Sequence, residues 1–139
     1  MPKGHDFKLF PELTNNQMQF YYFDSPHKQM VEDFDAKVVR VKDGDTIQLR
    51  IDDRDFDFPL RLANIAAPEL DEEGGERSHK WLDNQIRGKD VTILLDDKRV
   101  EKWGRLLGEV LFTGMNMNDM SLDFGYSIKF EEIENAPFS

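Results

Sequence analysis

The stretch DFDFPLRLANIAAPEL, residues 55–70, alternates apolar and polar side chains in its first half. Successive side chains of a strand point to opposite faces, so this pattern predicts a half-buried β-strand over 55–62. Its buried face would carry Phe56, Phe58, Leu60 and Leu62, and its other face Asp55, Asp57, Pro59 and Arg61. The strand therefore presents an arginine near its end, and Glu69 follows just beyond it.

Two strands are predicted immediately before this stretch. AKVVRVK, residues 36–42, has strand character, and Asp43-Gly44 is a two-residue hairpin signal. DTIQLRI, residues 45–51, then alternates, and Asp52-Asp53 provides the next turn. Three consecutive strands joined by tight turns make a meander.

The sequence after this stretch predicts a helix and two more strands. A polar, glycine-rich loop over 71–77 leads into a helix over 78–88, whose apolar face carries Trp81, Leu82 and Ile86. Strands are expected at 90–96 and 105–112, separated by a charged loop at 97–104. Five strands with a helix between the third and fourth predict a β-rich α+β fold, a closed five-stranded barrel of the OB type with two or three helices.

The ends of the chain are predicted to differ from the barrel. Residues 117–125 suit a short helix that Asn118 would cap and Gly125 would end. We divide the chain into an N-terminal extension at 1–35, an OB-fold domain at 36–130 and a C-terminal tail at 131–139. MQFYYF, residues 18–23, reads as an extra strand that covers a sheet edge, or as an arm for a partner.

Composition limits the classes of function. The 139 residues contain no cysteine, which excludes disulfides and thiolate metal sites. The formal net charge is −10, which would repel nucleic acid unless a cleft is locally basic. The first 30 residues contain no continuous apolar segment, so we expect a cytoplasmic protein with no membrane partner. The oligomeric state stays open.

Four side chains suggest phosphate chemistry. They are Arg61 and Glu69 in the stretch quoted above, Asp45 in DGDT, and Arg105 in KWGRLLGEV at 102–110. Two guanidiniums can clamp the charge that a phosphate gains in its transition state. One carboxylate can deprotonate an attacking water, and another can hold a hard divalent cation.

These motifs, in order and spacing, resemble the staphylococcal nuclease (thermonuclease) family over about residues 36–130. The resemblance implies an OB-type barrel and calcium-dependent hydrolysis of DNA and RNA, with single-stranded or flexible nucleic acid as the partner. It implies that Arg61 and Arg105 bind phosphate and that Glu69 acts as general base or orients water. It also implies that Asp45 and the carbonyl of Ala67 ligate Ca²⁺ or another divalent ion.

The sequence departs from the family pattern at one ligand position. Where the family has I-D-A-P-E, this chain reads I-A-A-P-E, with Ala66 in place of the aspartate. We therefore expect a weakened metal site, which an acid of the 71–76 loop could complete. The alternative function is a non-catalytic module of the same fold that binds nucleic acid or a protein; an acidic mimic that binds a basic protein is a third.

Each candidate residue also has an ordinary structural interpretation. Arg61 could be an exposed strand arginine, Glu69 a turn or helix-entry acid, and Asp45 a residue that binds turn amides. Arg105 could form a surface ion pair with Glu101 or Glu109.

Overall fold

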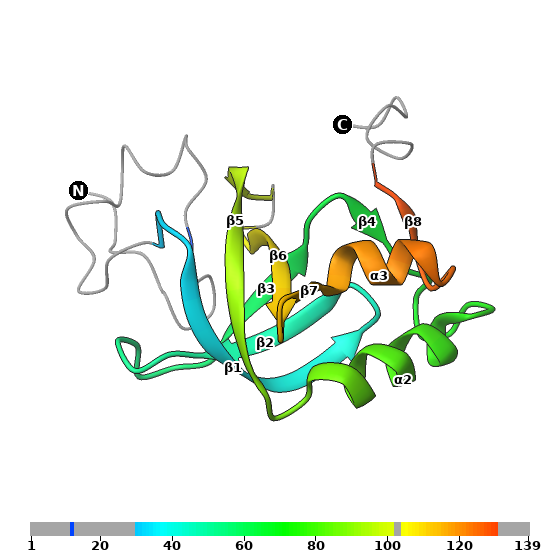
Figure 1. Ribbon diagram of the computed structural model, residues 1–139, viewed down its shortest axis with the longest axis horizontal. Helices are drawn as coiled ribbons and strands as arrows, with labels where there is room; N and C mark the ends of the chain where they lie inside the picture. The colour runs from blue at the N-terminus through cyan, green and yellow to red at the C-terminus, as the bar shows by residue number, and fades with distance from the viewer. Residues whose placement is uncertain (1–11, 13–29, 102–103, 131–139) are drawn as a thin grey trace, which may run out of the picture.

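Five strands close into a barrel in the computed structural model, which describes residues 12, 30–101 and 104–130 (Figure 1). The strands are β1 (Phe34–Asp43), β2 (Thr46–Arg50), β3 (Phe58–Leu62), β5 (Asp90–Val100) and β6 (Leu106–Phe112). They follow the order β3-β2-β1-β5-β6 with antiparallel neighbours, and a parallel pairing of β3 with β6 closes the ring. The predicted five-stranded OB-type barrel is confirmed.

Short elements flank the barrel. The helices of the described residues are α2 (Gly75–Ile86), which packs against β1, and α3 (Met117–Asp123), which packs against β6. The two-residue strand β7 (Met115–Asn116) pairs with β6, and β4 (Ile65–Ala66) pairs with β8 (Ile128–Lys129) in a separate ribbon. Neither α2 nor α3 is long and apolar enough to cross a membrane.

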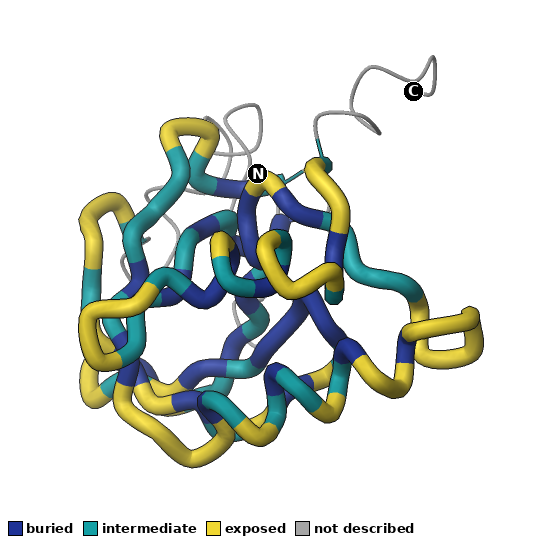
Figure 2. The backbone as a smooth tube through the Cα atoms, turned by 45° about the vertical axis from the view of Figure 1, so that its right-hand side comes forward, coloured by how far each residue is buried: buried dark blue, intermediate teal, exposed yellow. Residues whose placement is uncertain are grey.

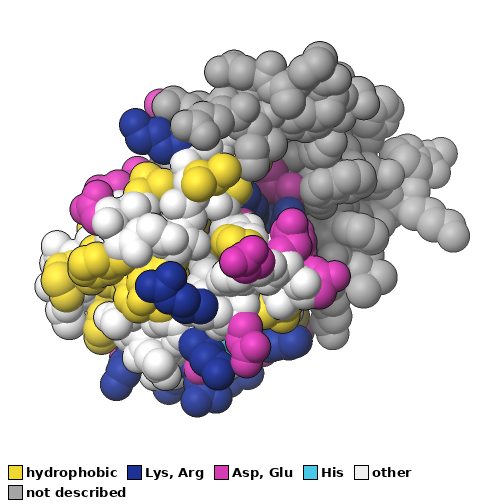
Figure 3. Space-filling view, turned by 90° about the vertical axis from the view of Figure 1, so that its right-hand side faces the viewer, with side chains coloured by type: hydrophobic (Ala, Val, Ile, Leu, Met, Phe, Trp, Pro, Cys, Tyr) yellow, Lys and Arg dark blue, Asp and Glu magenta, His cyan; other side chains and the backbone are white. Residues whose placement is uncertain are grey.

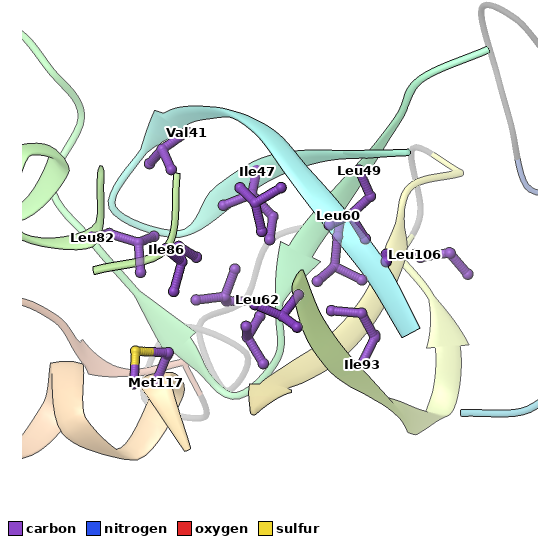
Figure 4. Close-up of a cluster of buried hydrophobic side chains, with 14 of the residues drawn as sticks. Val41, Ile47, Leu49, Leu60, Leu62, Leu82, Ile86, Ile93, Leu106 and Met117 are labelled. Carbon is purple, nitrogen blue, oxygen red and sulfur yellow. The ribbon is translucent and has the colours of Figure 1, made fainter. Parts of the chain in front are cut away.

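The core fills the barrel and the space between it and the two helices. The alternating face of β3 supplies Phe58, Leu60 and Leu62, all fully buried, as predicted. Leu82 of α2 and Met117 of α3 complete the cluster (Figure 4). Burying each large apolar side chain contributes roughly 1.5–3 kcal/mol, so this cluster is the main source of stability. Exposed residues are concentrated in turns and at the outer face of α2 (Figure 2).

Three boundaries differ from the predicted ones by three residues or more. β3 begins at Phe58 and not at 55, because its partner β2 ends one residue after Leu49, which lies opposite Phe58. α2 begins three residues earlier than predicted, at Gly75. β5 continues to Val100, since a shift in register lets Val100 pair with Leu106 of β6.

The predicted cap of the last helix is wrong. Asn116 is the N-cap of α3, and its side chain accepts a hydrogen bond from the N–H of Asp119 at 3.1 Å. Asn118 is buried, and its side chain donates to the Ala63 carbonyl at 2.9 Å and accepts from the Val110 N–H at 3.1 Å. Both asparagines suit a cap, but the side chain of Asn118 forms hydrogen bonds with backbone groups of the barrel instead. The strand expected at 18–23 lies outside the described residues.

Candidate active site

Asp45 and Arg61 form the centre of the candidate site. Asp45 immediately precedes β2, and Thr46, the first residue of β2, lies opposite Arg61 in the pairing with β3. This register brings the Arg61 Nη2 atom to 3.3 Å from the Asp45 Oδ2 atom. Both side chains are nearly buried, at 12% and 13% exposure, and Nη1 of Arg61 donates to the Leu62 carbonyl at 2.6 Å. The hairpin thus holds one guanidinium and one carboxylate in fixed geometry.

The Asp45 carboxylate is also bound by the backbone. Its Oδ2 atom accepts a hydrogen bond from the N–H of Ala67 at 2.8 Å, and its Oδ1 atom accepts from the Thr46 hydroxyl at 3.1 Å. Burial raises the pKa of Asp45 to about 6, against the opposing effect of Arg61, and the neighbouring Asp43 adds to the rise. Asp45 therefore ties the segment after β4 to the barrel and would gain from further positive charge.

A glycine allows this close packing. A Cβ atom at Gly44 would lie 2.0 Å from the Ser78 hydroxyl oxygen and 2.6 Å from the Cβ of Ala67. Any other residue would push the hairpin away from α2 and from the segment after β4. The glycine of the DGDT motif therefore has a steric role in addition to its role in the turn.

Glu69 lies on the exposed segment between β4 and α2. Its backbone N–H donates to Oε1 of Glu72 at 2.8 Å, and a Cβ atom at Gly75 would lie 1.8 Å from its carbonyl oxygen. Within the described residues, its carboxylate forms no hydrogen bond or ion pair with Asp45 or with the two candidate arginines. The structure thus fixes the backbone of Glu69 near the site and leaves its side chain unengaged.

Arg105 immediately precedes β6, the parallel neighbour of β3. Its Nη2 atom lies 3.1 Å from Oε2 of Glu101, and its N–H donates to Oε1 of the same carboxylate at 2.9 Å. The predicted ion-pair alternative therefore exists, with Glu101; the Glu109 carboxylate binds the Asn116 amide instead. The Nε atom of Arg105 is buried and lacks a hydrogen-bond partner within the described structure.

The two arginines influence each other electrostatically. Burial is the main cause that lowers the pKa of Arg61; Asp45 opposes this, and Arg105 adds to the lowering by repulsion. A second cation near a buried guanidinium is unfavourable unless an anion can join them. The carboxylates of Asp45, Asp43 and Glu101 oppose this lowering of the Arg61 pKa.

Sequence reasoning missed one aromatic neighbour of the site. The ring centroid of Phe130 lies 5.2 Å from the guanidinium carbon of Arg61, in cation–π range. The Phe130 N–H donates to the Asn64 carbonyl at 2.9 Å, which fixes the chain after β8 beside the end of β3. No local pattern pointed to Phe130, because this contact depends on the pairing of β4 with β8.

The site offers few ligands to a metal ion. The described residues contain no cluster of three His, Cys, Asp or Glu side chains able to surround one. Asp45, the adjacent Asp43 and backbone oxygen are the donors here, whereas Ca²⁺ takes about six to eight oxygens. They supply fewer donors than Ca²⁺ takes, so the described side chains do not by themselves surround a calcium ion.

A pocket of about 480 Å³ adjoins this edge of the barrel. Its lining includes Ala66, Ala67, Glu72, Glu73 and Tyr126. The face drawn in Figure 3 carries Lys and Arg side chains close to hydrophobic ones, with acidic side chains between them. Basic and acidic side chains are thus intermixed on this face (Figure 3).

The closed five-stranded barrel with a helix after β4 places the chain in the class of OB-type barrel proteins. The family model described as "Staphylococcal nuclease homologue" matches residues 59–137, more than half of the chain, and the chain belongs to this family.

Curated relatives agree with this assignment. An "Uncharacterized endonuclease" of Escherichia coli O157:H7 is 35% identical over 106 residues, which cover 76% of this chain and 67% of the relative. The "Micrococcal nuclease" of Shigella flexneri is 36% identical over 78 residues, or 56% of this chain and 42% of the relative. An "Uncharacterized endonuclease" of Haemophilus influenzae is 27% identical over 102 residues, covering 73% and 56%.

Proposed function

We propose that the protein is a metal-assisted phosphodiesterase that hydrolyses DNA, RNA or both. The observation that supports this most directly is the placement of Arg61 on β3, paired with the buried carboxylate of Asp45, and of Arg105, just before the neighbouring strand β6, close enough to repel each other. Membership of a nuclease family and relatives named as nucleases support the same reaction class.

In this proposal the phosphate enters between the two arginines. Arg61 is held by Asp45 and by the Leu62 carbonyl, so it is preorganised to face one oxygen. Arg105 keeps a buried Nε–H without a partner, which can donate to a second oxygen. Both groups stabilise charge that grows in the transition state. A flexible single strand suits this arrangement, because its phosphates can reach an inset pair of arginines.

Glu69 would orient or deprotonate the attacking water. Its exposed carboxylate, unengaged with the rest of the site, is free to turn toward a water beside the bound phosphate. Asp45, with the Ala67 carbonyl, would hold a divalent ion that neutralises the phosphate and lowers the pKa of bound water. Ca²⁺ is the ion that the family favours.

The test is cleavage of single-stranded DNA and RNA oligonucleotides over a calcium series. Arg61→Ala and Arg105→Ala should each lower the rate by roughly 10²–10³, as expected for a lost transition-state donor. Arg→Lys at either position should restore little, because a point charge cannot reproduce a two-pronged guanidinium contact. The matched control is Arg50→Ala, which removes an exposed arginine paired with Asp57 at 2.9 Å. Undiminished cleavage by Arg105→Ala would contradict the proposal.

The second candidate is a non-catalytic module that binds nucleic acid or a protein. Ala66 favours it, since that position lacks the carboxylate found in the family pattern. In that case wild-type protein would bind an oligonucleotide without cleaving it at any calcium concentration, and Arg61→Ala would lower the affinity alone.

A further inference from the structure

A buried acid from the N-terminal extension, Glu12, packs against the segment that carries Arg105. The carboxylate of Glu12 is fully buried and pairs with Arg54, which lies between β2 and β3, and with Arg99 near the end of β5. Oε2 of Glu12 also accepts a hydrogen bond from the Met30 N–H at 3.2 Å. One side chain thus joins three parts of the chain that are distant in sequence.

The cost of burying this acid indicates that the contact is specific. Burial raises the pKa of the Glu12 carboxyl, and Arg54, Met30 and Arg99 oppose that rise. The guanidinium of Arg54 in turn lies over the ring of Phe58, 4.5 Å from its centroid, in the barrel core. Glu12 is therefore anchored to the rigid part of the fold.

Arg99 sits at a strained position. Its φ angle is 67°, in the left-handed region that non-glycine residues seldom occupy and keep only when their surroundings hold them there. The pairing of β5 with β6 changes register between Leu95 and Val100, at this same point. Besides Glu12, the guanidinium of Arg99 binds the Met30 carbonyl at 3.2 Å. These contacts tie the bulged backbone at Arg99 to Glu12 and Met30.

The geometry of Arg105 follows from this bulge. Val100 pairs with Leu106, and the N–H of Glu101 donates to the Arg105 carbonyl at 2.9 Å. A Cβ atom at Gly104 would lie 3.0 Å from the carbonyl oxygen of Glu12, so the backbone of Glu12 also packs directly on this turn. A shift at Arg99 would therefore be transmitted to Arg105 over one short turn.

We propose that Glu12 is a positioning residue, which holds Arg99 and Gly104, and through them Arg105, in the geometry that receives a phosphate. This inference rests on the proposed function. Glu12 touches no substrate; it acts by holding Arg99 and the turn that follows. Glu12 is then part of the working site, although it lies outside the barrel strands.

The test compares Glu12→Ala and Glu12→Gln with Ile86→Ala, a core variant in α2, under conditions that give the three variants equal thermal stability. Hydrogen–deuterium exchange of the 99–106 amides measures how firmly this part of the backbone is held, without any assay of activity. We expect Glu12→Ala to speed exchange there tenfold or more relative to Ile86→Ala. Glu12→Gln keeps the shape of the side chain, so its exchange rate should lie between those of wild type and Glu12→Ala. Equal exchange in the Glu12→Ala and Ile86→Ala variants would overturn the proposal.

Steady-state kinetics of the same variants test the link to Arg105. Misplacing a transition-state donor by about 1 Å can cost roughly 10²-fold, so Glu12→Ala should lower kcat by about 10- to 100-fold with little change in KM. Ile86→Ala should leave kcat near the wild-type value, and an equal loss of kcat in both would overturn the link. A wild-type chain that does not cleave would refute the proposed function, and exchange would still decide whether Glu12 holds the segment.

Discussion

Arg61 and Arg105 receive different surroundings from the fold. Arg61 is almost buried and bound by Asp45 and a carbonyl, so little of its freedom remains to be lost when it binds an anion. Arg105 is 30% exposed and paired with Glu101 across four residues, where an ion pair contributes little. A phosphate can therefore compete with Glu101 for Arg105, whereas it must add to the contacts of Arg61.

If Asp45 holds a metal ion as proposed, Ala66→Asp should strengthen the site. The substitution adds a carboxylate next to Ala67, whose N–H already binds Asp45. Calcium affinity rises with the number of carboxylate ligands, so we expect a dissociation constant in the millimolar range for wild type and about tenfold or more tighter binding in the variant. Titration calorimetry with calcium alone measures this directly.

The matched control for that substitution is Asn64→Asp. It adds the same charge to the same connection, at an exposed residue whose φ of 68° an aspartate tolerates. Calcium affinity should stay at the wild-type value in this control. Tight calcium binding by the unmodified chain would show that another group, such as an acid of the 71–76 loop, already completes the site.

At the scale of elements, two asparagines of one short stretch should differ in their importance. Asn116→Ala removes the cap of α3 and should cost about 1 kcal/mol of unfolding free energy. Asn118→Ala leaves buried backbone groups of Ala63 and Val110 without a partner, at about 1–3 kcal/mol for each group. Urea unfolding followed by circular dichroism would measure both. Equal losses would mean that water replaces the Asn118 amide.

The barrel was predictable because its signals are local. Alternation places Phe58, Leu60 and Leu62 on one face whatever the rest of the chain does. The predicted turn was one residue too early: Asp43 is the last residue of β1 and pairs with Thr46, so Gly44 and Asp45 form the turn. The buried role of Asn118 was not predictable, because its side chain forms hydrogen bonds with carbonyl and amide groups of other elements of the fold.

The candidate site was predictable only in part, for the same reason. The pairing of Asp45 with Arg61 follows from the hairpin register. The burial of Glu12 on Arg54 and Arg99 joins residues more than forty positions apart, and nothing in their local sequence indicates it. The functional roles assigned to Asp45, Arg61, Ala67, Glu69 and Arg105 stay predictions.

For the whole molecule, net charge determines how nucleic acid should bind. A formal charge of −10 repels a polyanion at long range, so affinity must come from the few cations grouped at the site. Each phosphate neutralised on a single strand contributes about −0.7 to the slope of log K against log salt. With Arg61 and Arg105 as the contacts, we expect a slope near −1.4, measured by fluorescence anisotropy with a labelled oligonucleotide.

The same titration on two arginine variants separates a local site from a broad basic surface. Arg105→Ala should make the slope shallower by about 0.7, because one phosphate contact is lost, while Arg50→Ala should leave it unchanged. A wild-type slope of −4 or steeper would demand more phosphate contacts than two arginines can make. It would place the binding energy on a surface outside the barrel site, and the nuclease mechanism would then lose its main support.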